Sequence, residues 1–346
     1  MFNRSDPHSH SNSADGHHGH IHGAVDHAIL TTDRGIWALK WSLLGLSATA
    51  LFQIAIVWLS GSVALLADTI HNFGDAATAI PLWVAFRLAR WSPSRRFTYG
   101  YGRVEDLAGM TVVLTILFSA IVAGYESIER FFHPQEVGQL WAVVVASVIG
   151  FLGNEAVAIL RIKVGKEIGS AALVADGDHA RVDGLTSLAV LFGAGGVWLG
   201  YPLADPLIGL LITVVILRIV WESGKAVFTR LLDGVDPEVV DEIKNTATHI
   251  PGVRDVTEVR VRWLGHRLHA EVNVAVDATL SVQEGHATAK EVRHQLLHHV
   301  QHLFDATIHI DPVTASGEKH HRLGEHRHDN LSAHAHENGG SLSTEI

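Results

Sequence analysis

Six long apolar stretches constrain the fold of this chain more than any other feature of its sequence. They cover residues 36–59, 62–88, 107–129, 138–160, 171–199 and 204–228. Most of them reach the roughly 20 residues that a helix needs to cross the hydrocarbon core of a bilayer. The composition agrees, because only 18% of the 346 residues are charged, where about a quarter is usual in soluble proteins. The sequence therefore predicts an α-helical membrane protein with six transmembrane helices over residues 36–229.

Basic residues between the stretches predict the orientation. Eight of them fall in the second-to-third and fourth-to-fifth connections, namely Arg87, Arg90, Arg95, Arg96, Arg103, Arg161, Lys163 and Lys166. The connections on the other side carry only Arg130. Because positive loops stay in the cytoplasm, both termini are predicted to be cytoplasmic, in a multi-pass protein of the bacterial inner membrane.

Histidine is concentrated at the two ends of the chain. Of the 25 histidines, seven lie in residues 8–27 and six in residues 320–336, among Ser, Gly and Asn. Such segments bury too little apolar surface to fold, so residues 1–35 and 314–346 are predicted to be disordered cytoplasmic tails. They serve either as solubilising tails or tags, or as loose metal scavengers; the alternation of His with Gly and Ser favours scavenging.

Residues 233–313 have the pattern of a soluble domain. Asp236 caps a helix that has Pro237 at its first position, and Ser281 with Glu284 forms a capping box before a second helix. The predicted elements are helix 237–249, strands 256–261 and 268–276, helix 282–303 and strand 307–310. This α-β-β-α-β order predicts a cytoplasmic α+β domain of the ferredoxin-like or metallochaperone-like kind.

Composition also excludes several kinds of chemistry. The chain has no cysteine, which excludes disulfides and thiolate zinc sites, and its two methionines argue against a thioether copper site. A net charge of −10 without a basic block argues against nucleic acid as a partner. No arrangement of residues suggests an open metal position beside a general base, so an enzyme is not expected.

An internal repeat carries the predicted chemistry. Residues 61–75 read GSVALLADTIHNFGD and residues 169–183 read GSAALVADGDHARVD, with eight of fifteen positions identical. Three of the identical positions are ionisable: Asp68 with Asp176, His71 with His179, and Asp75 with Asp183. Ionisable residues inside a membrane are costly and usually functional, which makes this agreement informative.

The spacing predicts where these side chains meet. Residues four apart share a helix face, so each copy presents one imidazole beside one carboxylate. Each His is about 15 Å from the start of its repeat at 1.5 Å per residue, and the two spans run in opposite directions, so both pairs reach the middle of the bilayer. His71, Asp75, His179 and Asp183 are thus predicted to form a midplane site for Zn²⁺.

Other interpretations of the repeat remain open. The ionisable groups could pack the helix bundle, or they could relay protons without a metal. Asp68 and Asp176 are predicted to orient the ligands or to line the route to them. Asn154 and Glu155 in the fourth stretch either orient the site or make a helix–helix contact, and the second is favoured.

With the motifs HNFGD and HARVD, six apolar stretches and an α-β-β-α-β tail, residues 36–313 resemble the cation diffusion facilitators. The resemblance implies a homodimeric secondary transporter that moves Zn²⁺, and related ions such as Cd²⁺, Co²⁺ or Fe²⁺, out of the cytoplasm against protons. It also implies a second metal site in the cytoplasmic domain, built here from His286, His309, Asp311 and Glu271. The alternative is a membrane metal sensor or buffer that does not transport.

Overall fold

The computed structural model describes residues 22–60, 79–133, 140–201 and 203–314. Within these ranges the chain forms two compact units. The first runs to Leu231 and includes residues Leu264–Arg267, and the second comprises Leu232–Trp263 and the chain from Leu268 onward. Each unit has its own core and is described separately.

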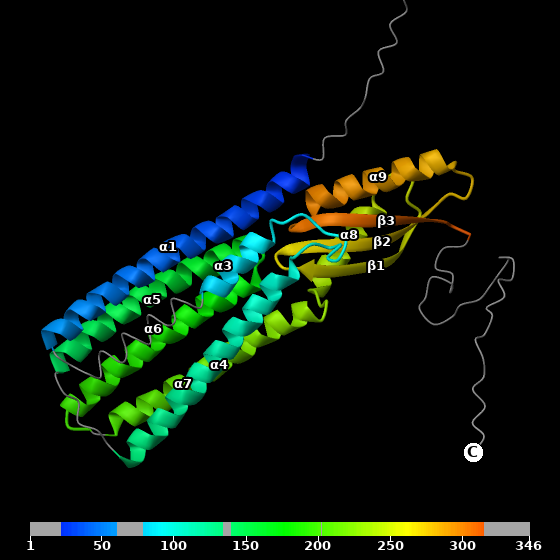
Figure 1. Cartoon of the computed structure of the whole chain (residues 1–346). Coiled ribbons are helices and arrows are strands. Elements are labelled where there is room, and N and C mark those ends of the chain that lie inside the picture. The colour runs from blue at the N-terminus through cyan, green and yellow to red at the C-terminus, as the bar shows by residue number, and fades with distance from the viewer. Residues whose placement is uncertain (1–21, 61–78, 134–139, 202, 315–346) are drawn as a thin grey trace, which may run out of the picture. The chain divides into compact units, whose positions relative to one another are not determined.

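The first unit is a bundle of helices. Its helices are α1 (His22–Ser60), α3 (Ala79–Leu88), α4 (Arg103–Phe132), α5 (Leu140–Ile168), α6 (Ala171–Trp198) and α7 (Ala204–Leu231). Helix α5 packs between α1 and α6, and α7 contacts both α4 and α6 (Figure 1). Helix α6 therefore has α5 along one side and α4 and α7 along another, so that it is covered over much of its surface.

Four helices of the described ranges are long and apolar enough to cross a membrane. They are residues Leu30–Ile56 of α1, together with α4, α5 and α7. Helix α6 has 28 residues, as many as α7, but it carries several charged side chains. The second predicted span, 62–88, falls outside the described residues except for α3. The helical membrane region is thus shown, whereas the number of six spans stays a prediction.

Two expectations about the membrane region are wrong in detail. Helix α1 begins at His22, so residues 22–35 are helical and do not belong to a disordered tail. The apolar Ile36 and Leu39 of this helix are buried against other helices, and that burial stabilises the segment. Arg161, counted as a loop residue, instead lies inside α5 with 1% of its side chain exposed.

The second unit contains the predicted α-β-β-α-β order. Its elements are α8 (Pro237–Thr248), β1 (Asp255–Leu264), β2 (Arg267–Val276), α9 (Val282–His299) and β3 (Leu303–Pro312). The sheet has the order β1-β2-β3, and β2 runs parallel to β3 with Asn273 opposite His309. Helix α9 ends four residues earlier than expected, because the buried Leu303 starts the last strand.

The two helices of this unit are fixed by the caps that the sequence predicts. The Asp236 side chain accepts a hydrogen bond from the Glu238 backbone N–H, and Ser281 and Glu284 form a reciprocal capping box. The helices pack on the sheet through a core that includes Ile243, Val272 and Leu296, all of them fully buried. The predicted strand alternation therefore places the apolar face inward.

Candidate metal centre

Helix α6 carries the half of the predicted metal site that the structure describes. The helix begins after Ser170, whose hydroxyl oxygen accepts a hydrogen bond from the Leu173 backbone N–H at 3.1 Å. The same hydroxyl donates to the Glu105 carboxylate of α4 at 2.5 Å, and both side chains are buried. The start of α6 is thereby fixed to α4, which sets the depth of every side chain farther along the helix.

His179 and Asp183 lie one turn apart on α6, as their spacing predicts. The distance from His179 Nδ1 to Asp183 Oδ1 is 3.9 Å, and the side chains are 1% and 9% exposed. One imidazole nitrogen and one carboxylate therefore stand side by side within the helix bundle. This is half of a Zn²⁺ ligand set, since imidazole and carboxylate are both common ligands of that ion.

The partner pair lies outside the described residues. His71, Asp75 and Asp68 belong to the segment 61–78, so the convergence of two His-Asp pairs stays a prediction. In the ranges that the structure does describe, no three His, Asp or Glu side chains gather closely enough to hold a metal ion. A complete site on α6 would need ligands from another segment.

Asp176, predicted to orient the ligands or to line their access route, forms a buried ion pair. Its Oδ2 lies 3.1 Å from Arg161 Nη1 of α5, and the two side chains are 0% and 1% exposed. The same Nη1 donates a hydrogen bond to the Asp176 backbone carbonyl at 3.3 Å. Sequence reasoning missed this pair because Arg161 looks like one of the positive residues of a cytoplasmic loop.

Two further polar contacts tie α6 to its neighbours. Arg181 donates to both carboxylate oxygens of Glu155 on α5, at 3.1 and 3.4 Å. Ser223 of α7 donates to the Asp178 carboxylate at 2.5 Å. The interpretation of Glu155 as a helix–helix contact is thus confirmed. Among the contacts that the structure describes for α6, the His179–Asp183 pair lies within the helix, whereas Asp176, Asp178 and Arg181 pair with neighbouring helices.

The residues implied for a cytoplasmic-domain site are only partly brought together. On β3, His309 Nε2 lies 3.0 Å from Asp311 Oδ1. Glu271 on β2 instead pairs with Arg262 at 3.4 Å, and His286 is an exposed residue of α9. Of these four residues, the structure brings His309 and Asp311 together within one copy of the chain.

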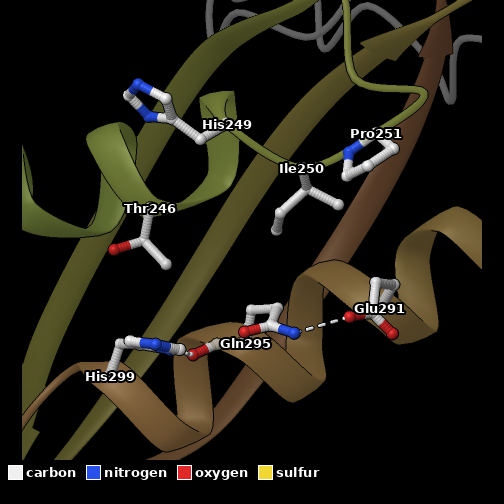
Figure 2. Close-up of a pocket in the computed structure, with 7 residues that line it drawn as sticks. All are labelled: Thr246, His249, Ile250, Pro251, Glu291, Gln295 and His299. Atoms are coloured by element: carbon white, nitrogen blue, oxygen red, sulfur yellow. Dashed lines mark hydrogen bonds between the residues drawn. The ribbon is translucent and has the colours of Figure 1, made fainter.

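A cavity of about 380 Å³ in the second unit lies between α8 and α9 (Figure 2). Two of its histidines point their Nδ1 atoms at backbone carbonyls one turn earlier, His249 at Asn245 and His299 at Gln295. Its Glu291 accepts a hydrogen bond from Gln295 at 2.6 Å. None of the residues that line it is one of the predicted metal ligands; they are Thr246, His249, Ile250, Pro251, Glu291, Gln295 and His299.

Comparison with known families agrees with this architecture. A family model described as the cation efflux transmembrane domain matches residues 39–232, and one described as the cytoplasmic domain of cation efflux proteins matches residues 235–313. A probable cation efflux system protein of Mycobacterium tuberculosis is 54% identical over 307 residues, which is 89% of this chain and 90% of the relative. The chain belongs to the cation diffusion facilitator family.

More distant proteins are also similar to this chain. The magnetosome protein MamB of a Magnetospira species is 27% identical over 74% of this chain and 87% of its own length. Metal tolerance protein C1 of Arabidopsis thaliana is 26% identical over 78% of this chain and 61% of its own length. A solved C-terminal domain of MamM matches 22% of this chain and 92% of its own, at 22% identity and a TM-score of 0.22.

These findings give the general function. The chain is a multi-pass membrane protein of a family that transports metal cations, and a family of transporters rather than enzymes. The resemblance drawn from the motifs HNFGD and HARVD is thereby confirmed at the level of the family. Membership does not by itself choose the metal or the driving ion.

Proposed function

We propose that this chain exports divalent cations, above all Zn²⁺, from the cytoplasm in exchange for protons. The proposal places the transported ion between His71, Asp75, His179 and Asp183 near the middle of the bilayer. Its main support is the His179–Asp183 pair, which is buried on a helix of membrane-spanning length. Cd²⁺, Co²⁺ and Fe²⁺ are further candidate cargoes, because ligand type alone separates them poorly from Zn²⁺.

The proposed topology follows the positive-inside rule. Six spans over residues 36–229 put both termini in the cytoplasm of a bacterial inner membrane. Residues 233–313 then form a cytoplasmic domain that joins two copies into a homodimer, in keeping with the family model over residues 235–313. Residues 1–21 and 314–346 are proposed to be His-rich cytoplasmic tails that collect metal loosely.

Proton exchange follows from the ligand chemistry. Zn²⁺ binds neutral imidazole and ionised carboxylate, so its arrival from the cytoplasm releases the protons that these groups hold. When the bundle opens to the outside, protons there compete for the same ligands and release the ion. This is alternating access around a fixed site at the bilayer midplane. Asp183 supplies negative charge and His179 supplies the nitrogen ligand.

A regulatory role is proposed for the cytoplasmic-domain residues. His309 and Asp311 already lie in contact on β3 and could form half of a metal site that a second copy completes. His286 and Glu271 are the other proposed ligands. A site completed across two copies would bind metal only in the dimer, so cytoplasmic metal would stabilise that dimer.

Zinc uptake by inverted membrane vesicles tests the transport site. With an inside-acidic pH gradient, wild-type vesicles should accumulate Zn²⁺, and the His179→Ala and Asp75→Ala variants should each lose nearly all of this uptake. His294→Ala, which removes an exposed histidine of α9, is the matched control and should transport as the wild type does. Uptake at the wild-type rate by His179→Ala would contradict the proposal.

The competing function is a metal sensor or buffer that does not transport. A buffer would bind Zn²⁺ equally well with or without the pH gradient, whereas an exchanger accumulates the ion only while the gradient lasts. The burial of an imidazole beside a carboxylate on a helix of membrane-spanning length supports the exchanger, since a sensor needs no ligands within the bilayer. Collapse of the pH gradient with a protonophore should therefore halt the uptake of Zn²⁺ or release the Zn²⁺ already accumulated.

A further inference from the structure

The Arg161–Asp176 pair is unusual because it places an extra carboxylate beside the proposed site. Asp176 lies three residues before His179 on α6, so the two side chains share one helix face. Asp183 lies four residues after His179 on that face. Without Arg161, α6 would present two carboxylates and one imidazole to a cation, where the proposed site uses one of each.

Apart from Arg161, the described surroundings of Asp176 offer its carboxylate oxygens no hydrogen-bond partner. The side chain is fully buried, and among the described residues neither carboxylate oxygen has a partner in hydrogen-bond geometry. Its compensation is the guanidinium of Arg161, whose Nη1 lies 3.1 Å away. A buried carboxylate held by one ionic contact is one that a divalent cation could bind if the arginine were absent.

Arg161 is itself held in a way that fits this role. Its Nη1 donates to the Asp176 backbone carbonyl, and its Nε and Nη2 have no hydrogen-bond partner within the described part of the chain. Gly177 brings the helices together here, because a Cβ on it would lie 3.1 Å from the Cβ of Arg161. The close approach leaves the guanidinium next to Asp176 in a space from which water is largely excluded.

We infer that Arg161 is a specificity-determining residue that occupies Asp176 and so prevents it from joining the metal site. The inference rests on the proposed function, in which His179 and Asp183 bind the transported ion. Imidazole suits Zn²⁺, whereas additional carboxylate oxygens suit harder cations such as Mn²⁺. Arg161 thus keeps the contribution of α6 at one nitrogen and one oxygen ligand, and disfavours Mn²⁺.

Proteoliposomes that contain the full-length protein test this selectivity. Initial uptake rates are measured for Zn²⁺ and Mn²⁺ over a range of concentrations. Arg161→Met should raise the ratio of kcat/KM for Mn²⁺ to that for Zn²⁺ by roughly tenfold, because Asp176 becomes an added oxygen ligand. Arg161→Lys keeps the positive charge and should keep the wild-type ratio.

The double variant Arg161→Met/Asp176→Asn separates selectivity from packing. It removes the carboxylate that Arg161→Met exposes, so its ratio should return to that of the wild type. A merely structural role for the pair would lower the uptake of both ions equally in each variant. An unchanged ratio in folded Arg161→Met, or a double variant that behaves as Arg161→Met does, would overturn the inference.

Two measurements keep the test decisive. If Arg161→Met does not fold, the Asp176→Asn variant is measured in its place. This variant leaves the buried guanidinium of Arg161 without its counterion, and the unbalanced positive charge should raise the KM for Zn²⁺ several-fold. An unchanged KM overturns the inference. Equilibrium competition of Mn²⁺ against Zn²⁺ on the purified variants reports the ligand set without transport. A shifted competition with no uptake by the wild type would refute the proposed function and leave the role of Arg161 standing.

Discussion

Two aspartates on α6, seven residues apart, have different surroundings and so different chemistry. Asp176 faces a guanidinium that never gives up its charge, whereas Asp183 faces an imidazole that can be neutral or charged. Asp176 therefore has a permanent cation as its ionic partner. Asp183 lies next to an imidazole, which is itself a metal ligand, so Asp183 is the carboxylate that fits the proposed exchange site.

Glu284 on α9 gives a prediction about pH that lies outside the membrane. Hydrogen bonds from the Ser281 hydroxyl and the Ser281 backbone N–H lower the pKa of its carboxyl group below the usual 4.5. Because the folded-state pKa is the lower one, the cap stabilises α9 above pH 4.5 and loses this effect as the pH falls through the folded-state pKa. Ser281→Ala should therefore speed amide exchange in the first turn of α9 at neutral pH, measured as protection factors.

The effect of Ser281→Ala should shrink in acid, because the Glu284 carboxyl of the wild type is protonated there and contributes less to the cap. Val282→Ala is the matched control, because the Val282 side chain is 93% exposed and takes no part in the cap. It should leave the protection factors of this turn unchanged or slightly higher, since Ala favours a helix. An equal loss of protection in both variants would show that the capping box does not hold this end of the helix.

At the scale of elements, α5 and α6 form an antiparallel pair whose register is fixed in two ways. Glycines allow close contact: a Cβ on Gly165 would meet the backbone N of Val174, and one on Gly177 would meet that of Ile162, each at 2.9 Å. Two ion pairs between the helices then select one alignment. Helix α5 supplies the cation opposite Asp176 and the anion opposite Arg181. Sliding one helix along the other would separate both ion pairs.

Substitution of Gly177 tests this close packing. Gly177→Ala forces a Cβ within 2.7 Å of the Ile162 side chain and 2.9 Å of its backbone N, so the helices must move apart. Overpacking of this kind costs about 1–3 kcal/mol, and the apparent Tm of the detergent-solubilised protein should fall by several degrees. Zinc transport should fall as well, because α6 carries His179.

Gly195→Ala on the same helix is the control for this substitution. A Cβ at Gly195 has no neighbour within 4 Å among the described residues, so the change adds helix propensity without a clash. Its apparent Tm should equal or exceed that of the wild type. A loss of stability as large as that of Gly177→Ala would mean that flexibility of α6, rather than its contact with α5, explains the glycines.

The sequence predicts local features of this chain better than contacts between helices. The caps at Asp236 and Ser281 depend on neighbouring residues only, and the structure confirms both. The one-turn pairing of His179 with Asp183 follows from helix geometry in the same way. The partnership of Arg161 with Asp176 depends on how two helices are aligned, and nothing in a single apolar stretch encodes that alignment.

The ends of α1 and α5 differ from the prediction because contacts with other helices outweigh local composition there. Residues 22–35 look like part of a polar leader, yet they are helical because the apolar side chains that follow are buried among other helices. Arg161 looks like a loop residue by its charge, and an ion pair with Asp176 allows it to lie within the bundle. In both cases the side chains that decide the local structure belong to another helix. They are distant in the sequence, and the sequence does not predict how the two helices are aligned.

For the whole molecule, the question is whether metal moves through the membrane unit or is retained by the His-rich ends. Removing residues 1–21 and 315–346 deletes most of the histidines at both ends but leaves every proposed transport ligand in place. If α6 carries the function, the shortened chain should keep its pH-dependent zinc uptake at saturating Zn²⁺. The expected cost is a higher apparent KM, because fewer loose ligands gather the ion near the cytoplasmic mouth.

The decisive experiment compares zinc uptake by the shortened chain with uptake by the same shortened chain carrying His179→Ala. Both lack the tails, so any remaining difference in uptake belongs to one buried imidazole. Loss of uptake in the first would assign the function to the tails, as a buffer requires. Uptake in the first and none in the second would locate transport within the helix bundle, with the tails acting only to raise the local concentration of the ion.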